Sequence, residues 1–128
     1  MSYKIQLELR ERCLFAAASG ERTCKNVAAI AGEILDECVR ANVARVFLDL
    51  RQLSGRLDIS ESILVITEMF PKMGLSQKLE RVAVLESQER HERSRFFERA
   101  AHARGYNLRM FDDQDEAMDW ISASRQLA

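Results

Sequence analysis

The chain has 128 residues, 47% hydrophobic and 30% charged, which is ordinary for one globular domain and argues against a disordered chain. Its 19 Lys and Arg residues are offset by 20 Asp and Glu residues, so the net charge of −1 lacks the basic excess typical of nucleic-acid-binding proteins. No apolar run approaches membrane-spanning length and no secretory signal is visible. We therefore expect one cytoplasmic domain over residues 1–128 that binds no nucleic acid and does not span a membrane.

The cysteine content supports the same compartment. The three cysteines, Cys13, Cys24 and Cys38, are odd in number and form no CxxC pair. Reduced thiols in a cytoplasm are more consistent with this pattern than a disulfide framework.

The first half of the chain predicts a hairpin, a helix and a strand. Hydrophobic residues alternate over 3–9, as in a half-buried strand, and 13–18 can return as its antiparallel partner. Helical spacing then begins at Val27, with Thr23 as the expected N-cap and an end near Ala41. The apolar run 45–50 predicts a strand covered on both faces, and 53–55 reads as a loop.

The second half predicts three further helices and two strands. Asp58 or Ser60 can cap a helix that ends near Pro71 and Gly74. A buried strand is expected at 81–85, a highly charged helix at about 88–104, and a last strand at 107–111. Asp112 or Asp113 can cap the final helix.

The predicted order is therefore β-β-α-β-α-β-α-β-α. It indicates an α/β fold with one mixed, mostly parallel five-stranded sheet, an N-terminal antiparallel hairpin and about four covering helices. In such sheets, ligands tend to bind beyond the carboxyl ends of the strands. The polar residues expected to gather there, as a site for a ligand or partner, are Asp49, Arg51, Ser54, Arg56, Asp58, Ser60 and Ser87.

No pattern in the chain predicts catalysis, a metal or a cofactor. His91 and His102 lie on one predicted helix, about 16 Å apart along its axis, which is too far to share one metal ion. Cys24 lies near a helix N-terminus, where a thiolate is stabilised, but neither histidine is near it in sequence. The chain contains no Gly-rich phosphate loop, nucleophile elbow or HExxH motif.

Two segments allow a structural and a functional interpretation. The mixed charges over 89–99 fit a solvated helix face, or an arginine cluster that receives an acidic or phosphorylated partner. The apolar residues of the second helix, with Met69, Phe70 and Met73 near its end, fit core packing, or a surface for a lipid or partner.

The order of these features resembles the SpoIIAA-like branch of the STAS domains, the sulfate transporter and anti-sigma-factor-antagonist fold, which is similar to the lipid-binding Sec14 core. The resemblance covers nearly the whole chain. It rests on the opening strand 1–5, the stretches 43–51, 55–58 and 81–85, the helix segment 95–98 with its end at 104–105, and the strand ending at Phe111.

The resemblance implies a regulatory switch. In anti-sigma antagonists, a kinase phosphorylates a serine at the start of the helix after the third strand, and the added charge prevents partner binding. The usual Asp-Ser-Ser-Gly signature is absent here, and Ile59 occupies the acceptor position. Ser60, or Ser54, is then the candidate for phosphorylation, with Ser60 as a simple N-cap being the structural alternative.

Three functions follow as hypotheses. The first is a non-catalytic regulatory or interaction module that binds a partner protein or forms a homodimer. The second, by similarity to the Sec14 core, is a carrier or sensor of a small apolar or anionic ligand, which requires a cavity between the sheet and the second or third helix. The third is an enzyme whose nucleophile and base converge only in the folded chain.

Overall fold

The computed structural model describes residues 2–123, without the side chains of residues 76, 90 and 91. The strands are β1 (Tyr3–Arg10), β2 (Cys13–Glu21), β3 (Arg45–Ser54), β4 (Arg81–Leu85) and β5 (Leu108–Phe111). The helical segments are α1 (Cys24–Ala41), α2 (Ile59–Leu64), the π-helical turn η1 (Val65–Met69), α3 (Phe70–Met73), α4 (Leu75–Lys78), the 3₁₀ turn η2 (Gln88–Arg90), α5 (His91–Ala103) and α6 (Gln114–Ser122).

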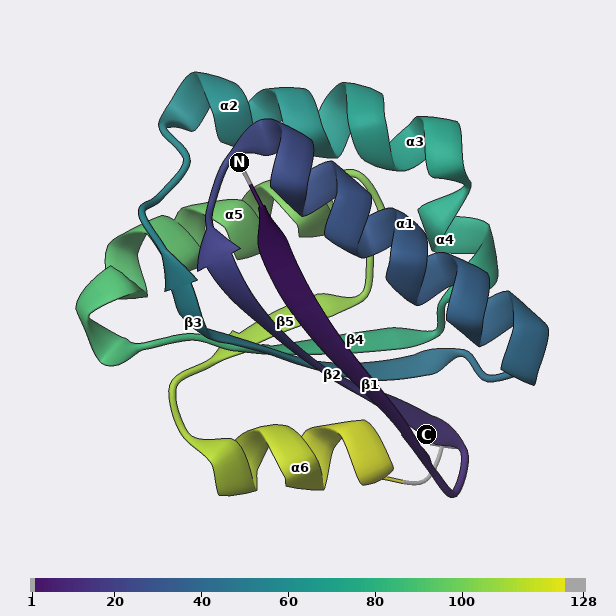
Figure 1. Cartoon of the computed structure of the whole chain (residues 1–128). Helices are drawn as coiled ribbons and strands as arrows, with labels where there is room; N and C mark the ends of the chain where they lie inside the picture. The colour runs from purple at the N-terminus through teal and green to yellow at the C-terminus, as the bar shows by residue number, and fades with distance from the viewer. Residues whose placement is uncertain (1, 124–128) are drawn as a thin grey trace.

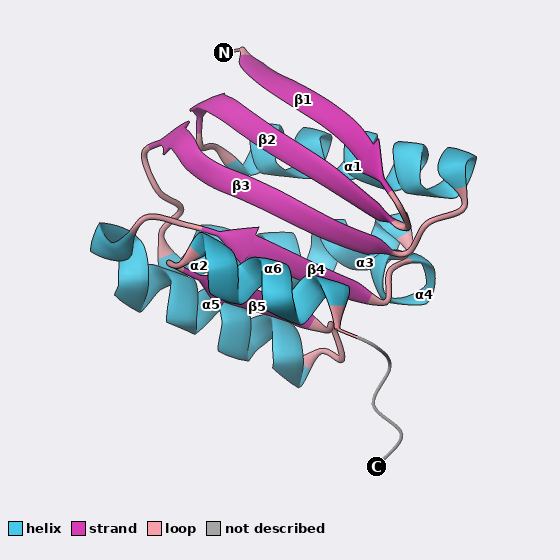
Figure 2. Ribbon diagram, turned by 90° about the horizontal axis from the view of Figure 1, so that it is seen from below, coloured by secondary structure: helices cyan, strands magenta, loops and turns pink. Residues whose placement is uncertain are grey.

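The strands form one sheet in the order β1-β2-β3-β4-β5. β1 is antiparallel to β2, and the other neighbouring pairs are parallel. Because successive parallel strands are neighbours and crossovers are right-handed, the connecting helices all lie on one face of the sheet. α1, α2 to α4 and α5 cover that face, and α6 covers the other (Figures 1 and 2). The predicted α/β class, mixed sheet, hairpin and four helical regions are confirmed.

α1 forms because its apolar residues recur at helical spacing and its ends are capped. The Thr23 hydroxyl accepts a hydrogen bond from the Asn26 N–H at 3.0 Å, as predicted for the N-cap. Asn42 ends the helix in the left-handed conformation. Ile30, Ile34, Leu35 and Cys38 lie on the buried face of this helix.

β3 is longer than predicted, because after a bulge it continues to pair with β2. The prediction ended this strand at Leu50 and placed 53–55 in a loop, but Leu53 and Ser54 pair with the end of β2. Two residues of β3, Leu50 and Arg51, lie opposite the single residue Ala18, which is a β-bulge. The extra residue returns Leu53 to the helix-covered face, where it is fully buried. β2 likewise continues beyond the predicted residue 18, to Glu21.

The second helical region begins at Asp58. The Asp58 carboxylate accepts from the Glu61 N–H at 2.7 Å, and the Glu61 carboxylate accepts from the Asp58 N–H at 2.9 Å, which completes a capping box. Asp58 is therefore the cap, and Ser60 lies inside the first turn. The single predicted helix is interrupted by η1, where the Phe70 N–H donates to the Val65 carbonyl. This wider turn precedes Pro71, whose ring would clash with the carbonyl four residues earlier in a regular α-helix.

The later boundaries differ by a few residues from those predicted. The helix expected at 88–104 divides into η2 and α5, and the strand expected at 107–111 begins at Leu108. Of the two candidate caps for the last helix, Asp113 is the cap, and its carboxylate accepts from the Glu116 N–H at 3.1 Å.

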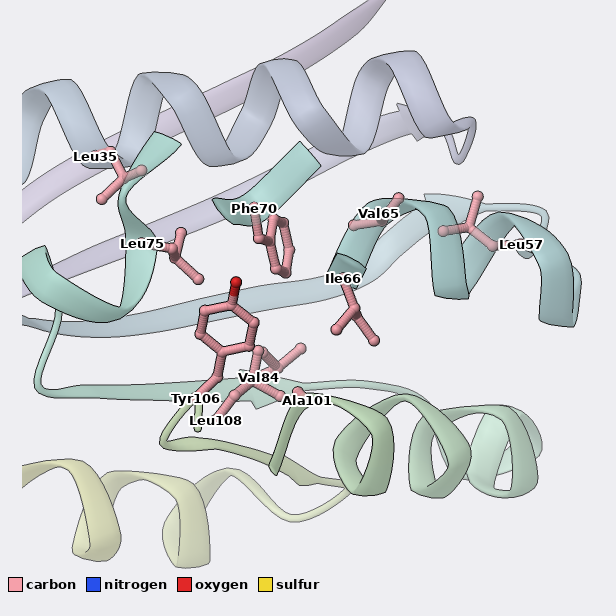
Figure 3. Packing of buried hydrophobic residues seen from close by; sticks show 10 residues of the cluster. All are labelled: Leu35, Leu57, Val65, Ile66, Phe70, Leu75, Val84, Ala101, Tyr106 and Leu108. Carbon is pink, nitrogen blue, oxygen red and sulfur yellow. The ribbon is translucent and has the colours of Figure 1, made fainter. Parts of the chain in front are cut away.

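Two hydrophobic clusters lie on the helix-covered face of the sheet. One joins η1, α3, α4, α5 and the strands β4 and β5 to Leu35 of α1, with the Phe70 and Tyr106 rings in edge contact at a centroid distance of 5.8 Å (Figure 3). The other joins α1 to β2 and β3. A third cluster lies under α6 on the opposite face, around Phe47, Leu85 and Ile121.

β1 is the exposed edge of the sheet. Tyr3 and Ile5 contact the cluster under α1, as the alternating pattern predicts. Leu7 and Leu9, farther along the same strand, are exposed to solvent, which the pattern of a half-buried strand does not predict.

The capping box yields a stability prediction. Replacing Asp58 with Ala should lower the free energy of unfolding by about 1 kcal/mol, because the first turn of α2 loses the acceptor for one backbone N–H. The matched control Ser60→Ala should stay within about 0.5 kcal/mol of the wild type, since Ser60 is exposed and caps nothing. Urea denaturation of the three proteins measures both. A larger loss for Ser60→Ala than for Asp58→Ala would show that the cap is wrongly assigned.

Candidate functional site

A buried ion pair lies at the carboxyl end of the sheet. Arg22 follows β2 directly, and Glu86 follows β4 directly, so both lie beyond the carboxyl ends of parallel strands. The Arg22 Nη2 atom lies 2.6 Å from a Glu86 carboxylate oxygen, and the side chains are only 11% and 3% exposed. Burying two charges is costly unless they are paired and hydrogen-bonded, and this geometry satisfies that condition.

Arg22 also bonds the end of β3. Its Nε atom donates to the Gly55 carbonyl at 3.2 Å, and its Nη2 atom donates to the Leu53 carbonyl at 3.2 Å. Its own backbone N–H donates to the Ser54 carbonyl at 2.8 Å. One side chain therefore joins the segments that leave β2, β3 and β4.

A cavity of about 120 Å³ lies behind this ion pair, between the sheet and helices α1, α2, α3, α4 and α5. Most of its wall is apolar and comes from Val46, Leu48, Leu50, Val82, Val84, Met110 and the facing residues of the helices. The hypothesis of a small-ligand carrier required a cavity in this part of the fold.

The two clusters on this face lie on either side of the cavity. Both of them border on the same partly buried residues, Leu48, Leu50, Leu79 and Val82, and all of these line the cavity. A domain usually packs one contiguous core. Leucines near the middle of a covered sheet are only partly buried here because the hollow in front of them is not filled by side chains.

The polar part of the wall is confined to the carboxyl end of the sheet. It consists of Arg22, Arg56, Ser62, Glu86, Arg93 and Ser94, which lie in or next to the first turns of the helices after β2, β3 and β4. Among these, Arg56 is exposed, so the cavity reaches the surface there. The Arg93 Nη1 atom donates to the Leu57 carbonyl at 2.8 Å, which connects α5 to the start of α2.

Asp49 and Arg51 do not join the other predicted site residues. Leu48 and Leu50 line the cavity, and because side chains alternate along a strand, Asp49 and Arg51 point to the opposite face, as Phe47 does. The Arg51 guanidinium lies 2.9 Å from the Asp49 carboxylate. Burial would raise the pKa of Asp49, but hydrogen bonds from the Arg51 side chain and backbone outweigh burial and hold that pKa below its ordinary value.

The remaining predicted site residues lie at the end of β3, at the start of α2 and after β4. Arg56 lines the cavity, whereas Asp58 is used in the capping box. The Ser54 hydroxyl donates to the Gly20 carbonyl at 3.0 Å, which ties the ends of β2 and β3 together. Ser60 is exposed, and the Ser87 N–H donates to the Glu86 carboxylate at 3.0 Å. Binding by any of these residues stays a prediction.

Apolar side chains lie on both sides of the helical region that begins with α2, and within α2 itself Ser62 is the buried residue. Val65, Ile66 and Phe70, which follow α2, are buried in the core, as the packing interpretation of this stripe expects. On the solvent side, however, Ile59, Ile63 and Leu64 are 43% to 55% exposed. Ser60 is one turn before Leu64 and lies next to Ile59, so it shares this outer surface.

The cysteines are free thiols in a protonated state. Burial raises the pKa values of Cys13 and Cys38 to about 11. Burial first, and then the carboxylates of Glu61 and Asp58, also raise the pKa of Cys24. At this helix N-terminus the pKa of Cys24 is therefore raised and not lowered, because its surroundings are apolar and acidic.

The side chain of His102 contacts the backbone of β5. The His102 Nε2 atom lies 2.7 Å from the Leu108 carbonyl, and the side chain of His91 lies outside the described residues. Over residues 2–123, no group of three or more His, Cys, Asp or Glu residues could hold a metal ion. Nor does this part of the chain contain a helix long and apolar enough to cross a membrane.

The comparisons with known proteins agree with this architecture. The family model described as SpoIIAA-like matches residues 14–122, from β2 to the end of α6. The chain belongs to the SpoIIAA-like family. A comparison with the curated proteins finds no match.

Two solved structures share the fold of this SpoIIAA-like domain. One is an uncharacterised protein of the DUF3478 family with a SpoIIAA-like fold from Shewanella loihica PV-4, with 19% identity, 93% of each chain covered and a TM-score of 0.56. The other is an anti-sigma factor antagonist from Mycobacterium paratuberculosis, with 13% identity, 95% of this chain and 96% of the other covered, and a TM-score of 0.60.

The predicted site residues do not include Arg22, Glu86 or the buried serines of the cavity, and Arg93 enters the prediction only as part of the charged stretch 89–99. Glu86 directly follows a predicted strand, so the rule that selected Ser87 could have selected it. Arg22 has no such signal, because its side-chain partners are 28 to 64 residues away in the chain.

The ion pair of the SpoIIAA-like domain should be important for stability. Replacing Arg22 with Ala should lower the free energy of unfolding by about 3 kcal/mol or more, because Glu86 stays buried without this guanidinium. The control Arg51→Ala removes an arginine from a more exposed pair and should cost no more than about 1 kcal/mol. Equal losses for the two variants in urea denaturation would contradict the role given to Arg22.

The thiols of Cys13 and Cys38 should react slowly in the folded domain. At about pH 8, a pKa of about 11 leaves roughly one thousandth of Cys13 and Cys38 as thiolate, against about a quarter in an unfolded chain. The rate of reaction with a disulfide reagent should therefore rise with pH well beyond pH 9 and rise strongly on unfolding. Fast modification of Cys13 or Cys38 in the native protein near pH 8 would contradict this.

Proposed function

We propose that this SpoIIAA-like domain is a non-catalytic regulatory module that acts by binding a partner protein. The observation that carries the proposal is the outer surface of α2, where Ile59, Ile63 and Leu64 are exposed next to each other. Large apolar side chains gathered on one helix face are typical of an interaction site. The solved anti-sigma factor antagonist with the same fold supports a protein as the partner.

The surroundings of this surface suit recognition by a rigid element. Ile59 and Ile63 are four residues apart, so they lie one above the other on the helix. The capping box fixes the start of α2, and Arg93 holds the preceding Leu57 carbonyl. A partner would therefore meet a preformed apolar ridge, with the charged residues Arg56, Asp58 and Glu61 at one end of it.

A phosphate on Ser60 would act as a switch on this surface. Ser60 is exposed within the first turn of α2 and lies between the apolar side chains. A phosphate would add about −1.5 to −2 charges there, beside Asp58 and Glu61, and would oppose an apolar contact. Ser54 is the weaker candidate, because its hydroxyl already bonds the Gly20 carbonyl.

The non-catalytic part of the proposal is supported by the state of the reactive groups. The cysteine thiols have raised pKa values, and His102 is bonded to the Leu108 carbonyl. A cytoplasmic location belongs to the same proposal, because the thiols are free and reduced cysteines are usual in that compartment.

The partner surface can be tested by quantitative capture from the organism's own lysate. The variants Ile63→Asp and Ser60→Asp should reduce recovery of one specific protein at least about tenfold, since an apolar hot spot contributes more than 1.4 kcal/mol. The wild type, Ser60→Ala and Val39→Asp should recover it equally. Val39 is the matched control, because it is also an exposed apolar helix residue but lies near the other end of α1.

Measuring the oligomeric state of the same variants in solution distinguishes a different partner protein from a second copy of the chain. Leu7 and Leu9 on the open edge of β1 offer another apolar surface, on which a homodimer could form. A dimer in solution that Leu7→Lys disrupts, together with no loss of captured protein in Ile63→Asp, would overturn the assignment of α2 and favour the homodimer.

The cavity favours a second candidate function, a carrier or sensor of a small ligand. The observation behind it is the hollow between the two clusters, walled by apolar side chains and reaching the surface at Arg56. Both functions can coexist in one domain, because the partner surface is on the outside of α2 and the cavity is on its inside.

A further inference from the structure

We infer that the cavity beneath α2 binds a small amphipathic acid, whose apolar part is about the size of a benzene ring or a five-carbon chain. Its anionic group would lie at the polar end, near Arg56 and Arg93. This inference rests on the second function proposed above and does not depend on the partner surface.

The size of the cavity sets the apolar part. Its volume is about 120 Å³, and an engineered apolar cavity of about 150 Å³ is known to bind benzene. A ring of six atoms or a short alkyl chain therefore fits, whereas a membrane phospholipid or a long fatty acid does not. Its deep wall of Val46, Leu48, Val84, Leu108 and Met110 offers no polar partner to water, so an apolar group is favoured over solvent there.

Two buried serines mark the polar end. Ser62 is 6% exposed and Ser94 is 8% exposed, and both line the cavity. Neither hydroxyl has a hydrogen-bond partner among the residues that the structure describes, yet no side-chain polar atom there is both fully enclosed and unsatisfied. The hydroxyls therefore face the hollow itself. Buried polar groups normally have partners, so these two donors are available to a bound polar group.

The charge at this end favours an anion. Three arginines and one glutamate line it, and Glu86 neutralises Arg22. Arg93 donates one hydrogen bond to the Leu57 carbonyl. Arg56 forms no hydrogen bond or ion pair within the described part of the chain, and it is the exposed residue at which the cavity opens. An arginine can bind a carboxylate with two parallel hydrogen bonds.

The geometry thus combines an apolar interior with a cationic entrance. The polar residues all come from the segments that follow β2, β3 and β4, and the apolar residues come from the sheet and the inner faces of the helices. An acid with a short tail would place its tail against Leu48 and Leu50 and its charge near Arg56. This arrangement satisfies the serine hydroxyls and the free guanidinium together.

The test uses hexanoate, hexan-1-ol and acetate as probes, titrated against the full chain and followed by amide and methyl chemical shifts. Hexanoate should bind with saturation and shift the methyl signals of Leu48 and Leu50. Hexan-1-ol, which has a similar tail but no charge, should bind at least about tenfold more weakly, because it lacks a charge-assisted hydrogen bond. Acetate should not bind measurably, because it lacks the tail.

Matched variants locate the site. Arg56→Gln should reduce hexanoate affinity at least about fivefold and leave hexan-1-ol unchanged. Arg51→Gln, an exposed arginine on the other face of the sheet, should change neither. Ala31→Leu places a larger side chain in the cavity wall and should abolish binding of both tailed probes. Contacts between the hexanoate tail and the Leu48 and Leu50 methyl groups locate the site independently if this last variant does not fold.

The outcomes separate the inference from the function on which it rests. Equal binding of hexanoate and hexan-1-ol, or an unchanged hexanoate affinity in Arg56→Gln, would contradict the inference that the ligand is an acid. The domain would then be a carrier of neutral apolar molecules. Binding of neither tailed probe would mean that the cavity holds water only, which overturns both. Capture of a partner by the outer face of α2 is a separate measurement and is affected by neither result.

Discussion

A guanidinium buried beneath three strand ends must find acceptors for its N–H groups, and this requirement determines how the carboxyl end of the sheet is built. Arg22 stays charged at any physiological pH, so a carboxylate is needed near it, and Glu86 supplies one. Its other N–H groups bond carbonyls at the end of β3. The starts of α1, α2 and α5 are consequently held in one arrangement, although they are far apart in the chain.

The cavity opens at the same end of the sheet. Charged and polar side chains occupy this end, so the apolar core does not close over it. The cluster under α1 and the cluster under η1, α3 and α5 stop on either side of Leu48, Leu50, Leu79 and Val82. The bulge in β3 turns Leu53 back into the core and directs the chain toward Gly55, whose carbonyl Arg22 binds. The Arg22–Glu86 ion pair, the bulge in β3 and the cavity therefore depend on one another.

Much of the fold could be predicted because it depends on local patterns. The helical spacing from Val27, the cap at Thr23 and the apolar runs at 45–50 and 81–85 each encode their element directly. The bulge could not be predicted, since a single extra residue shows only against the partner strand. The π turn before Pro71 is likewise a compromise between a proline and the packing of Phe70.

The sequence could predict at which end of the sheet the candidate site lies, but not which residues form it. The rule that ligands bind beyond strand ends led to Arg56 and to the neighbourhood of Asp58, but it could not assign faces. Asp49 and Arg51 end up on the other side of the sheet, because alternation along β3 places them opposite Leu48 and Leu50. Arg22 and Ser94 needed the folded chain, since their surroundings come from segments distant in sequence.

α2 is a short helix whose solvent side is apolar and whose other side carries Ser62, which lines the hollow. A molecule bound in the cavity would contact the same helix that a partner protein would bind from outside. If binding on one side alters the position of α2, thermodynamic reciprocity requires that both dissociation constants change by the same factor. The domain would then report the concentration of a metabolite as a change in protein association, without phosphate transfer or any rearrangement of the sheet.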